Sequence, residues 1–176
     1  MIDWEKIEVG LKEYRGIMKT FEKVNAKRNL EFQKSFNNFY RIQRRRSKFY
    51  KDFYKKLEAS KGKNPDFEEV LVYLWKASGR KNVEKSFASK LVHTLNPNMP
   101  ILDSVVLDHF GLGKEVNAGK HRLGRGVELY DALGIWYREY LESPEGKKDL
   151  EKFDKKFHHS GITDIKKLDF MIWMDR

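Results

Sequence analysis

The chain has 176 residues, a length that suits one domain with its own hydrophobic core. Hydrophobic residues make up 40% of it and aromatic residues 14%, so we expect a folded protein although 35% of the residues are charged. The formal charge of +10 favours nucleic acid as a partner, because cationic side chains that neutralise phosphates release counterions. An ordinary but unusually basic surface is the alternative, and binding to an acidic membrane surface is a third reading.

Composition and residue spacing exclude several classes of chemistry. The chain has no cysteine, which excludes disulfides, thiolate metal sites and a cysteine nucleophile. His93, His109 and His121 lack partners at the spacing of metal ligands, so we expect neither a metal nor another cofactor. The first residues have no apolar signal core, and no apolar run is long enough to span a bilayer. We therefore expect a cytoplasmic protein without membrane contact, and nothing indicates an obligate protein partner.

Two apolar stripes at helical spacing occupy the first third of the chain. The first, within residues 2–24, consists of Ile7, Leu11, Tyr14, Ile17, Met18, Phe21 and Val24. The second consists of Phe36, Phe39, Tyr40, Tyr50, Phe53, Tyr54 and Leu57. Polar residues at Gln43 and at Arg46 and Ser47 interrupt the second stripe, so we expect its helix to kink or leave the core there.

The densest basic segment of the chain overlaps this second stripe. Its cationic residues are Arg41, Arg44, Arg45, Arg46, Lys48, Lys51, Lys55 and Lys56. Helical spacing places Arg41, Arg44 or Arg45, and Lys48 on one side, where they could follow a phosphate backbone. A solvated helix face fits the same spacing.

The middle of the chain has the pattern of helix, tight turn and helix. Asp66 is a good N-cap for the helix Phe67–Ala77. After a short turn, Asn82 is placed to cap a helix that ends near Leu95. The prolines that follow stop this helix, and Asp103 begins the next one.

The last third of the chain also predicts helices. Residues 111–126 are punctuated by glycine and are expected to form a loop. The apolar stripe in residues 129–140 predicts a helix, Ser143 caps a polar helix expected to run to His159, and Thr163 helps to cap the last one. No strand pair or internal repeat is visible. We predict an all-α fold, a compact single-domain helical bundle over the whole chain, with a helix-hairpin-helix-like unit before Asp103.

The most informative segment runs from Ser86 to Leu112. A tight turn at residues 79–85 leads into a helix and a short loop, after which Ile101, Leu102 and Asp103 open a helix ending in Phe110-Gly111-Leu112. This order of elements resembles the core of the helix-hairpin-helix DNA glycosylase superfamily. Beyond this segment, the chain is similar to that family in being helical and basic.

The resemblance implies double-stranded DNA with a flipped-out base as the substrate and Asp103 as the catalytic carboxylate. Cleavage of an N-glycosidic bond develops positive charge on the sugar, and a fixed carboxylate can stabilise that charge or orient a water molecule. The N-terminus of a helix keeps a carboxylate ionised, which suits this role. The need for an N-cap at the start of this helix would by itself also explain why an aspartate stands at position 103.

Family members that also cleave the DNA backbone use a lysine on the preceding helix as a Schiff-base nucleophile. Lys85 matches that lysine by spacing, whereas an alignment on Ala88 and Ser89 puts Ser86 there. An exposed charge in the first helical turn is the other interpretation of Lys85, and Lys90 has the same two interpretations. We therefore predict a monofunctional enzyme.

The resemblance also implies DNA contacts at the hairpin. Gly79, Arg80 and Lys81 would contact phosphates there, together with the basic segment. The family hairpin has a second glycine shortly after the first, where this chain has Val83. Gln43, alone on an apolar stripe, is a candidate for filling the position that the flipped base vacates.

A flipped base has to be held between aromatic or apolar walls. The candidates are Phe36, Phe39, Tyr40, Trp75 and Trp136, although aromatic residues at helical spacing are also typical of a plain core. Pocket shape depends on tertiary contacts, so the base itself is not specified by these residues.

Three functional hypotheses follow. The first is a DNA glycosylase that releases a damaged or modified base and leaves an abasic site, in repair or in defence against phages. The second is a non-enzymatic helical module that binds DNA or RNA, which the single hairpin glycine favours. The third is a helical interaction protein whose charge is incidental.

Overall fold

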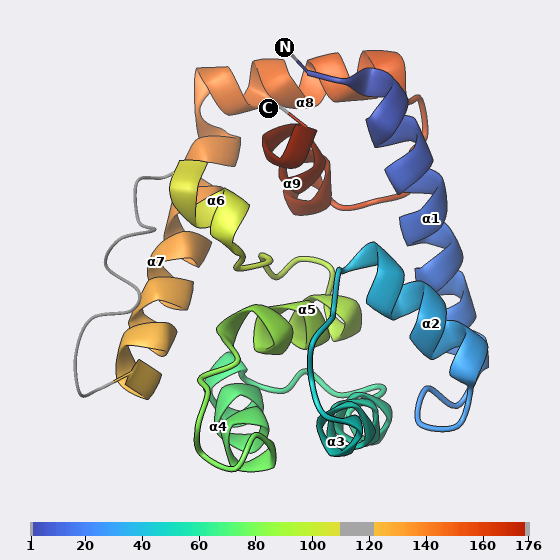
Figure 1. The fold of residues 1–176 in the computed structure, drawn as a ribbon. Coiled ribbons are helices and arrows are strands. Elements are labelled where there is room, and N and C mark those ends of the chain that lie inside the picture. The colour runs from blue at the N-terminus through green and yellow to red at the C-terminus, as the bar shows by residue number, and fades with distance from the viewer. Residues whose placement is uncertain (1, 110–121, 175–176) are drawn as a thin grey trace.

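The computed structural model describes residues 2–109 and 122–174, and within these ranges the chain forms helices and no strand (Figure 1). The predicted all-α fold class is confirmed. In chain order the helices are α1 (Trp4–Lys23), α2 (Leu30–Phe39), α3 (Ser47–Ala59), α4 (Phe67–Ala77), α5 (Lys85–Leu95), α6 (Ser104–His109), α7 (Arg122–Glu142), α8 (Pro144–Lys156) and α9 (Asp164–Met174).

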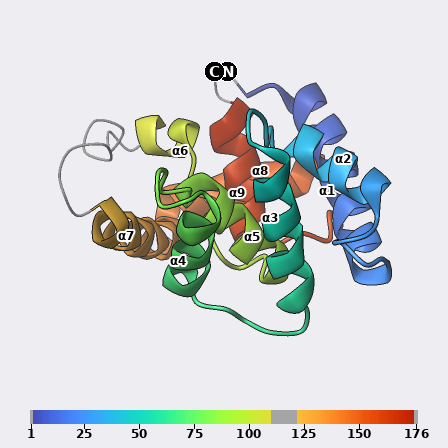
Figure 2. The same ribbon diagram turned by 60° about the horizontal axis from the view of Figure 1, so that its bottom comes forward.

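Helix α9 packs against α1, α6, α7 and α8 (Figure 1). A cluster of buried side chains joins α1, α8 and α9, and it consists of Ile7, Leu11, Tyr14, Phe153, Phe170 and Met171. A larger cluster fills the space between α2, α3, α4, α5 and α7. In Figure 2, α3, α4 and α5 lie between α7 on one side and the α1–α2 pair on the other. The candidate site lies where the two clusters meet.

Helix starts follow the predicted capping residues, with one exception. Asp66, Ser143 and Thr163 accept hydrogen bonds from backbone amides at the starts of α4, α8 and α9. Asn82 does not cap α5, which begins three residues later at Lys85. The Ser78 hydroxyl donates to the carbonyl oxygen of Asn82 at 3.0 Å and accepts from its N–H at 3.4 Å, so Asn82 belongs to the turn.

The loop at residues 40–46 separates α2 from α3 completely. Arg41 and Arg44 have φ angles of 51° and 60°, and a left-handed conformation cannot continue a helix. The prediction that Arg41, Arg44 or Arg45 and Lys48 share one helix face is therefore wrong, because helical spacing does not apply within this loop. Ile42 is buried in the middle of the loop and anchors it to the core.

Two further boundaries differ from the expected ones. Helix α7 begins at Arg122, so residues 122–126 are helical and not part of the predicted loop. The rest of that loop lies outside the described residues. Helix α8 ends at Lys156 and not at His159, whose φ of 55° is incompatible with a continuing helix.

The docking of α9 on α1 depends on Gly10. A methyl group added at Gly10 would lie 2.9 Å from Cε1 of the buried Phe170 ring, whereas at Gly16 of the same helix nothing lies within 4 Å. We expect Gly16→Ala to raise the free energy of unfolding by about 0.5–1 kcal/mol, because alanine favours a helix over glycine. Gly10→Ala should instead lower it by about 1–2 kcal/mol through overpacking.

Chemical denaturation of both variants measures this difference. Equal stabilisation by the two substitutions would show that the Phe170 ring moves aside freely and does not constrain the docking of α9.

Candidate active site

The connection between α5 and α6, residues 96–103, is anchored by side chains from three other parts of the fold. The hydroxyl groups of Thr163 and Tyr130 donate to the carbonyl oxygens of Pro97 and Pro100 at 2.7 and 3.1 Å. The amide of Leu102 donates to the Ser89 hydroxyl oxygen at 2.9 Å. Because buried backbone groups need partners, these bonds determine the path of the connection and the position of the residue that ends it.

His93 supplies a further anchor for this connection. The ring of His93 is fully buried, with Nδ1 2.7 Å from the carbonyl oxygen of Met99 and Nε2 3.0 Å from the hydroxyl of Tyr14. Since a carbonyl only accepts, Nδ1 carries the proton and Nε2 accepts from Tyr14. His93 thus links α1, α5 and the connection as a neutral ring.

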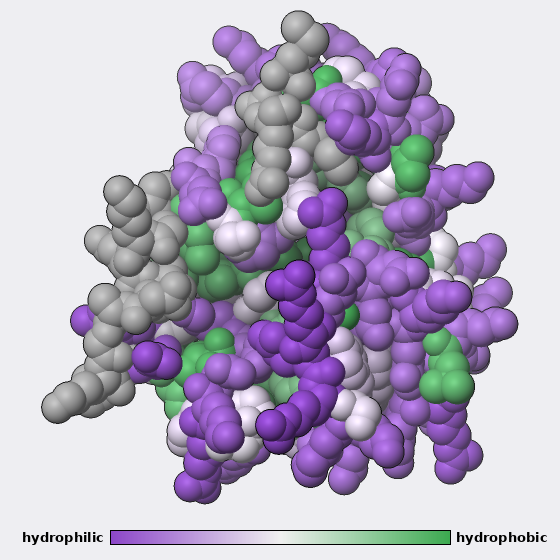
Figure 3. Space-filling view, in the orientation of Figure 1, coloured by the Kyte–Doolittle hydropathy of each residue, from purple (hydrophilic) through white to green (hydrophobic). Residues whose placement is uncertain are grey.

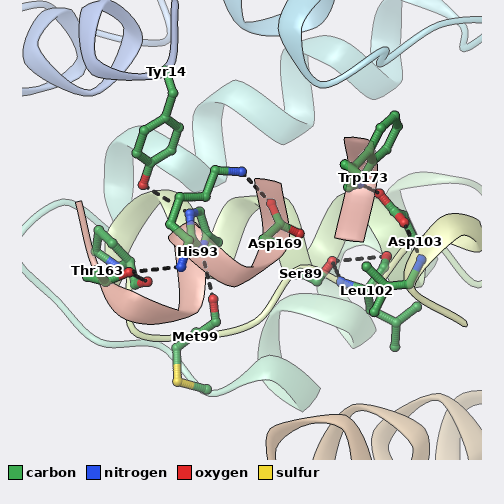
Figure 4. Close-up of polar contacts among 12 residues, drawn as sticks. Tyr14, Ser89, His93, Met99, Leu102, Asp103, Thr163, Asp169 and Trp173 are labelled. Carbon is green, nitrogen blue, oxygen red and sulfur yellow. Dashed lines mark hydrogen bonds and ion pairs between the residues drawn. The ribbon is translucent and has the colours of Figure 1, made fainter. Parts of the chain in front are cut away.

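The residue that this connection positions is Asp103, whose carboxylate is anchored at both oxygens. Oδ1 accepts from the amides of Val105 and Val106 at 3.0 and 3.1 Å, which caps α6 as predicted. Oδ2 accepts from the indole N–H of Trp173 on α9 at 2.8 Å, and the two side chains point toward each other (Figure 4). Asp103 is only 7% exposed. The carboxylate is therefore held in one orientation and largely shielded from water.

The electrostatics of Asp103 differ from those of a simple exposed cap. Burial and the charge of Asp169 raise its pKa above the usual value, while the hydrogen bonds of Val106 and Trp173 and the charge of Lys90 oppose that rise. The amides at the start of α6 favour the ionised form of Asp103, as expected, but burial has the larger effect on its pKa and acts in the opposite direction.

Asp103 lies on the wall of a cavity of about 580 Å³, a size typical of small-molecule sites. The cavity lies between α1, the end of α2, α5 and α9, and aromatic side chains form part of its wall: Phe39, Tyr40, Phe170 and Trp173. Five carboxylates and four cationic side chains also line it, so its wall has no positive excess although the chain as a whole does. Such a wall suits a neutral, planar ligand better than a phosphate.

The structure brings some of the sequence-predicted residues to this cavity and not others. Phe39, Tyr40 and Arg41 line it together with Asp103. Trp75 and Trp136 do not. The guanidinium of Arg80 lies over the Trp75 ring at 5.6 Å, and Trp136 stacks on Tyr140 along α7 with ring centroids 4.8 Å apart. The fifth candidate, Phe36, is fully buried in the larger core cluster.

The two lysines considered from the sequence occupy different environments. Lys85 begins α5 and does not line the cavity; its side chain lies against Gly126 of α7, and burial followed by the charge of Arg122 lowers its pKa. Lys90 does line the cavity, is buried, and donates from Nζ to the carbonyl oxygen of Tyr40 at 3.0 Å. Of the two lysines, Lys90 is therefore the one that shares the cavity with Asp103.

The residues predicted to contact DNA have unequal freedom to do so. Arg45 forms a two-pronged ion pair with the buried Glu84, with Nε 2.9 Å from Oε1 and an N–H of the guanidinium terminus 2.9 Å from Oε2. Its guanidinium also lies 4.9 Å from the Phe87 ring centroid. Gln43 and Arg44 are exposed in the same loop, and Lys48 is exposed while paired with Asp52 at 2.7 Å. Arg45 therefore has a structural role that its loop neighbours lack.

The hairpin residues lie away from the cavity, at the α4–α5 turn. Gly79 and Arg80 have φ angles of 71° and 61°, so both adopt the left-handed conformation, which disfavours side chains such as that of Arg80. Gly79, Arg80 and Lys81 are all exposed. The turn thus presents two cationic side chains to solvent.

Sequence reasoning missed the part of α9 that lines the cavity, which includes three hydrogen-bonding side chains: Lys166, Asp169 and Trp173. The apolar stripe of this helix indicated docking alone. Spacing of three and four residues does place these polar side chains on one side of the helix, which is the signal that could have found them.

The helical fold thus places a buried carboxylate, hydrogen-bonded at both oxygens, on the wall of a cavity with aromatic side chains. No family model, no curated protein and no solved structure matches the chain. None of the helices in residues 2–109 and 122–174 combines the length and apolar character that a bilayer span requires.

The neutral His93 predicts a pH dependence of stability. Burial, followed by the charge of Lys166, lowers its pKa to about 3, from an ordinary value near 6.5. The unfolded ring binds a proton below about 6.5 while the folded ring does not, so we expect the free energy of unfolding to fall by about 1.4 kcal/mol per pH unit from about 6.5 toward about 3.

Chemical denaturation at a series of pH values tests this in the wild type and in His93→Gln, which cannot titrate. The slope should become shallower in His93→Gln and stay unchanged in His158→Gln, a substitution at an exposed histidine. The same slope in all three proteins would contradict the assignment to His93.

Proposed function

We propose that this chain is a DNA glycosylase: the cavity holds a base flipped out of duplex DNA, and Asp103 assists hydrolysis of its N-glycosidic bond. The observation that carries the proposal is the place of Asp103, a buried carboxylate with both oxygens anchored, on the wall of a cavity with aromatic sides. The resemblance of residues 86–112 to the helix-hairpin-helix glycosylases supports the same assignment.

The contacts of Asp103 suit stabilisation of charge better than transfer of a proton. In the reaction, the bond between C1′ and the base nitrogen breaks with its electron pair going to the base. Water then adds to C1′ and loses a proton, and the departing base takes up a proton from solvent. The sugar is cationic between these events, and a carboxylate held nearby in a dry site lowers the energy of that cation. The two amides and the Trp173 indole keep the carboxylate in place without a rearrangement during reaction.

The α2–α3 loop is the proposed contact with the DNA backbone. Figure 3 shows strongly hydrophilic side chains in a band over this loop, and above the band the surface is hollowed and exposes hydrophobic residues. Arg41, at the cavity rim, and Arg44 keep bulky side chains at left-handed positions, where glycine would be less strained. At the N-cap and in the first half of α1 the cavity is lined by three carboxylates, those of Asp3, Glu5 and Glu13, and by one cation, Lys6, which pairs with Asp3. The negative excess there favours phosphates on the side of the α2–α3 loop instead.

We expect Asp103→Asn to abolish the formation of abasic sites. Asparagine retains the capping ability of aspartate but removes the charge that stabilises the sugar cation, and loss of such a group typically lowers the rate by about 100-fold or more. The assay incubates modified duplexes and phage genomes with the protein and detects strand breaks after alkali. Breaks without alkali are not expected, because Lys85 does not line the cavity and Lys90, which does, is buried and donates to the carbonyl oxygen of Tyr40. Lys85→Ala should therefore behave like the wild type.

Asp66→Asn is the matched control, since Asp66 caps α4 with the same chemistry and does not line the cavity. It should leave the rate unchanged. The rate of the wild type should also fall as the pH drops through the raised pKa of Asp103, because protonation removes the stabilising charge. Absence of any Asp103-dependent abasic product over a broad panel of substrates would disprove the proposal.

Substitutions of Arg44 and Arg45 should affect different properties, DNA binding for Arg44 and folding stability for Arg45. Arg44→Ala is expected to reduce the salt dependence of DNA binding by about one counterion and to change stability by less than about 0.5 kcal/mol. Arg45→Ala leaves the buried Glu84 unpaired and should lower the free energy of unfolding by about 2–3 kcal/mol.

Fluorescence anisotropy at several salt concentrations and chemical denaturation measure the two quantities. An unchanged salt slope for Arg44→Ala would place the DNA contact elsewhere on the molecule.

A further inference from the structure

Asp169 on α9 has a carboxylate oxygen without a hydrogen-bond partner. Its Oδ2 accepts from the Lys166 ammonium at 2.5 Å, and both side chains are buried. Its Oδ1 is buried as well, and no donor among the described residues reaches it. A buried acceptor without a donor is unfavourable, and Asp169 lines the cavity. The unpaired Oδ1 therefore indicates a ligand that supplies the donor.

The surroundings of Lys166 determine which oxygen of Asp169 remains open. The ammonium lies 4.6 Å from the ring centroid of Phe170 and 4.9 Å from that of Tyr14, and two further rings at the end of α2 lie within 6.0 Å. Aromatic faces attract a cation, so this cage holds Lys166 in place. Oδ2 of Asp169 therefore stays bonded to Lys166, and Oδ1 is the oxygen available to a ligand.

Asp169 belongs to the same cavity as the proposed catalytic carboxylate. Asp169 and Trp173 are one helical turn apart on α9, and both line the cavity with Asp103. Trp173 donates its indole N–H to Asp103. One side of α9 thus combines an aromatic ring, the anchor of Asp103 and an open acceptor.

We propose that Asp169 determines the base specificity of the cavity, with Oδ1 accepting a hydrogen bond from an N–H group on the edge of the bound nucleobase. That the ligand is a nucleobase rests on the proposed function. An ionised carboxylate is an acceptor only, and its hydrogen bonds to N–H donors are strong. A base analogue without the N–H leaves Oδ1 unpaired, so the cavity rejects it.

The test measures binding of free nucleobases by ligand-observed NMR titration, in pairs that differ by one N–H group. The pairs are adenine and purine, and cytosine and 2-pyrimidinone, in each of which the second base lacks the exocyclic amino group of the first. In the wild type we expect at least one N–H-bearing base to bind about tenfold or more tightly than its partner.

Asp169→Asn should remove or reverse this preference. Lys166 only donates, so the amide oxygen of asparagine turns toward it and the amide N–H₂ takes the place of Oδ1. The matched control is Asp164→Asn on the same helix, since Asp164 bonds to Lys167 and does not line the cavity. That variant should keep the wild-type preference, and thermal unfolding of each variant confirms that it is folded.

Two results would overturn the role of Asp169. The first is that the wild type binds both bases of every pair with the same affinity, or binds none of them at millimolar concentration. The second is that Asp169→Asn shows the same difference in affinity as the wild type. Because the comparison of pairs uses the wild type, it does not depend on the stability of the variant. The NMR titration measures binding and not excision. Absence of an abasic product in the excision assay would therefore contradict the proposed glycosylase activity and leave the role of Asp169 in binding intact.

Discussion

The structure depends on how the α5–α6 connection is buried. Residues 96–103 have no helix to satisfy their backbone groups, and side chains of Ser89, His93, Tyr130 and Thr163 do so instead. These side chains come from α5, from α7 and from the residue before α9, so the connection can take this path only when those elements are docked. The position of Asp103 is a consequence of that docking, and the bond from Trp173 closes the arrangement from the side of α9.

Capping and a place at the cavity are not competing explanations of Asp103. Oδ1 is the cap of α6, and the same carboxylate lines the cavity through contacts that no helix cap requires, above all the indole of Trp173. Burial raises the pKa of the carboxyl group, whereas its hydrogen bonds and the charge of Lys90 favour the ionised form. The environment thus stabilises a particular geometry of the carboxylate at an electrostatic cost, which is typical of functional sites more than of helix caps.

Charge is distributed unevenly between the surface and the cavity. The chain is strongly basic, yet the cavity wall has slightly more carboxylates than cations. The arginines of the α2–α3 loop are themselves divided, because Arg45 pairs with the buried Glu84 while Arg44 is exposed to solvent. In the proposed function this division has a use, because a base-flipping enzyme has to hold phosphates and a base at separate places.

The sequence by itself determined the local features: helices α1 and α4, the caps at Asp66, Asp103, Ser143 and Thr163, and the charge, because periodicity and capping depend on neighbouring residues. Only the tertiary structure decided which side chains share a cavity. Both Lys85 and Lys90 lie on α5, but Lys85 packs against Gly126 of α7, whereas Lys90 lines the cavity with Asp103. Asp169 and Trp173 lie more than 60 residues beyond Asp103 in the chain. Their spacing places both on one side of α9, but only the docking of α9 on α1 and α6 brings that side to the cavity.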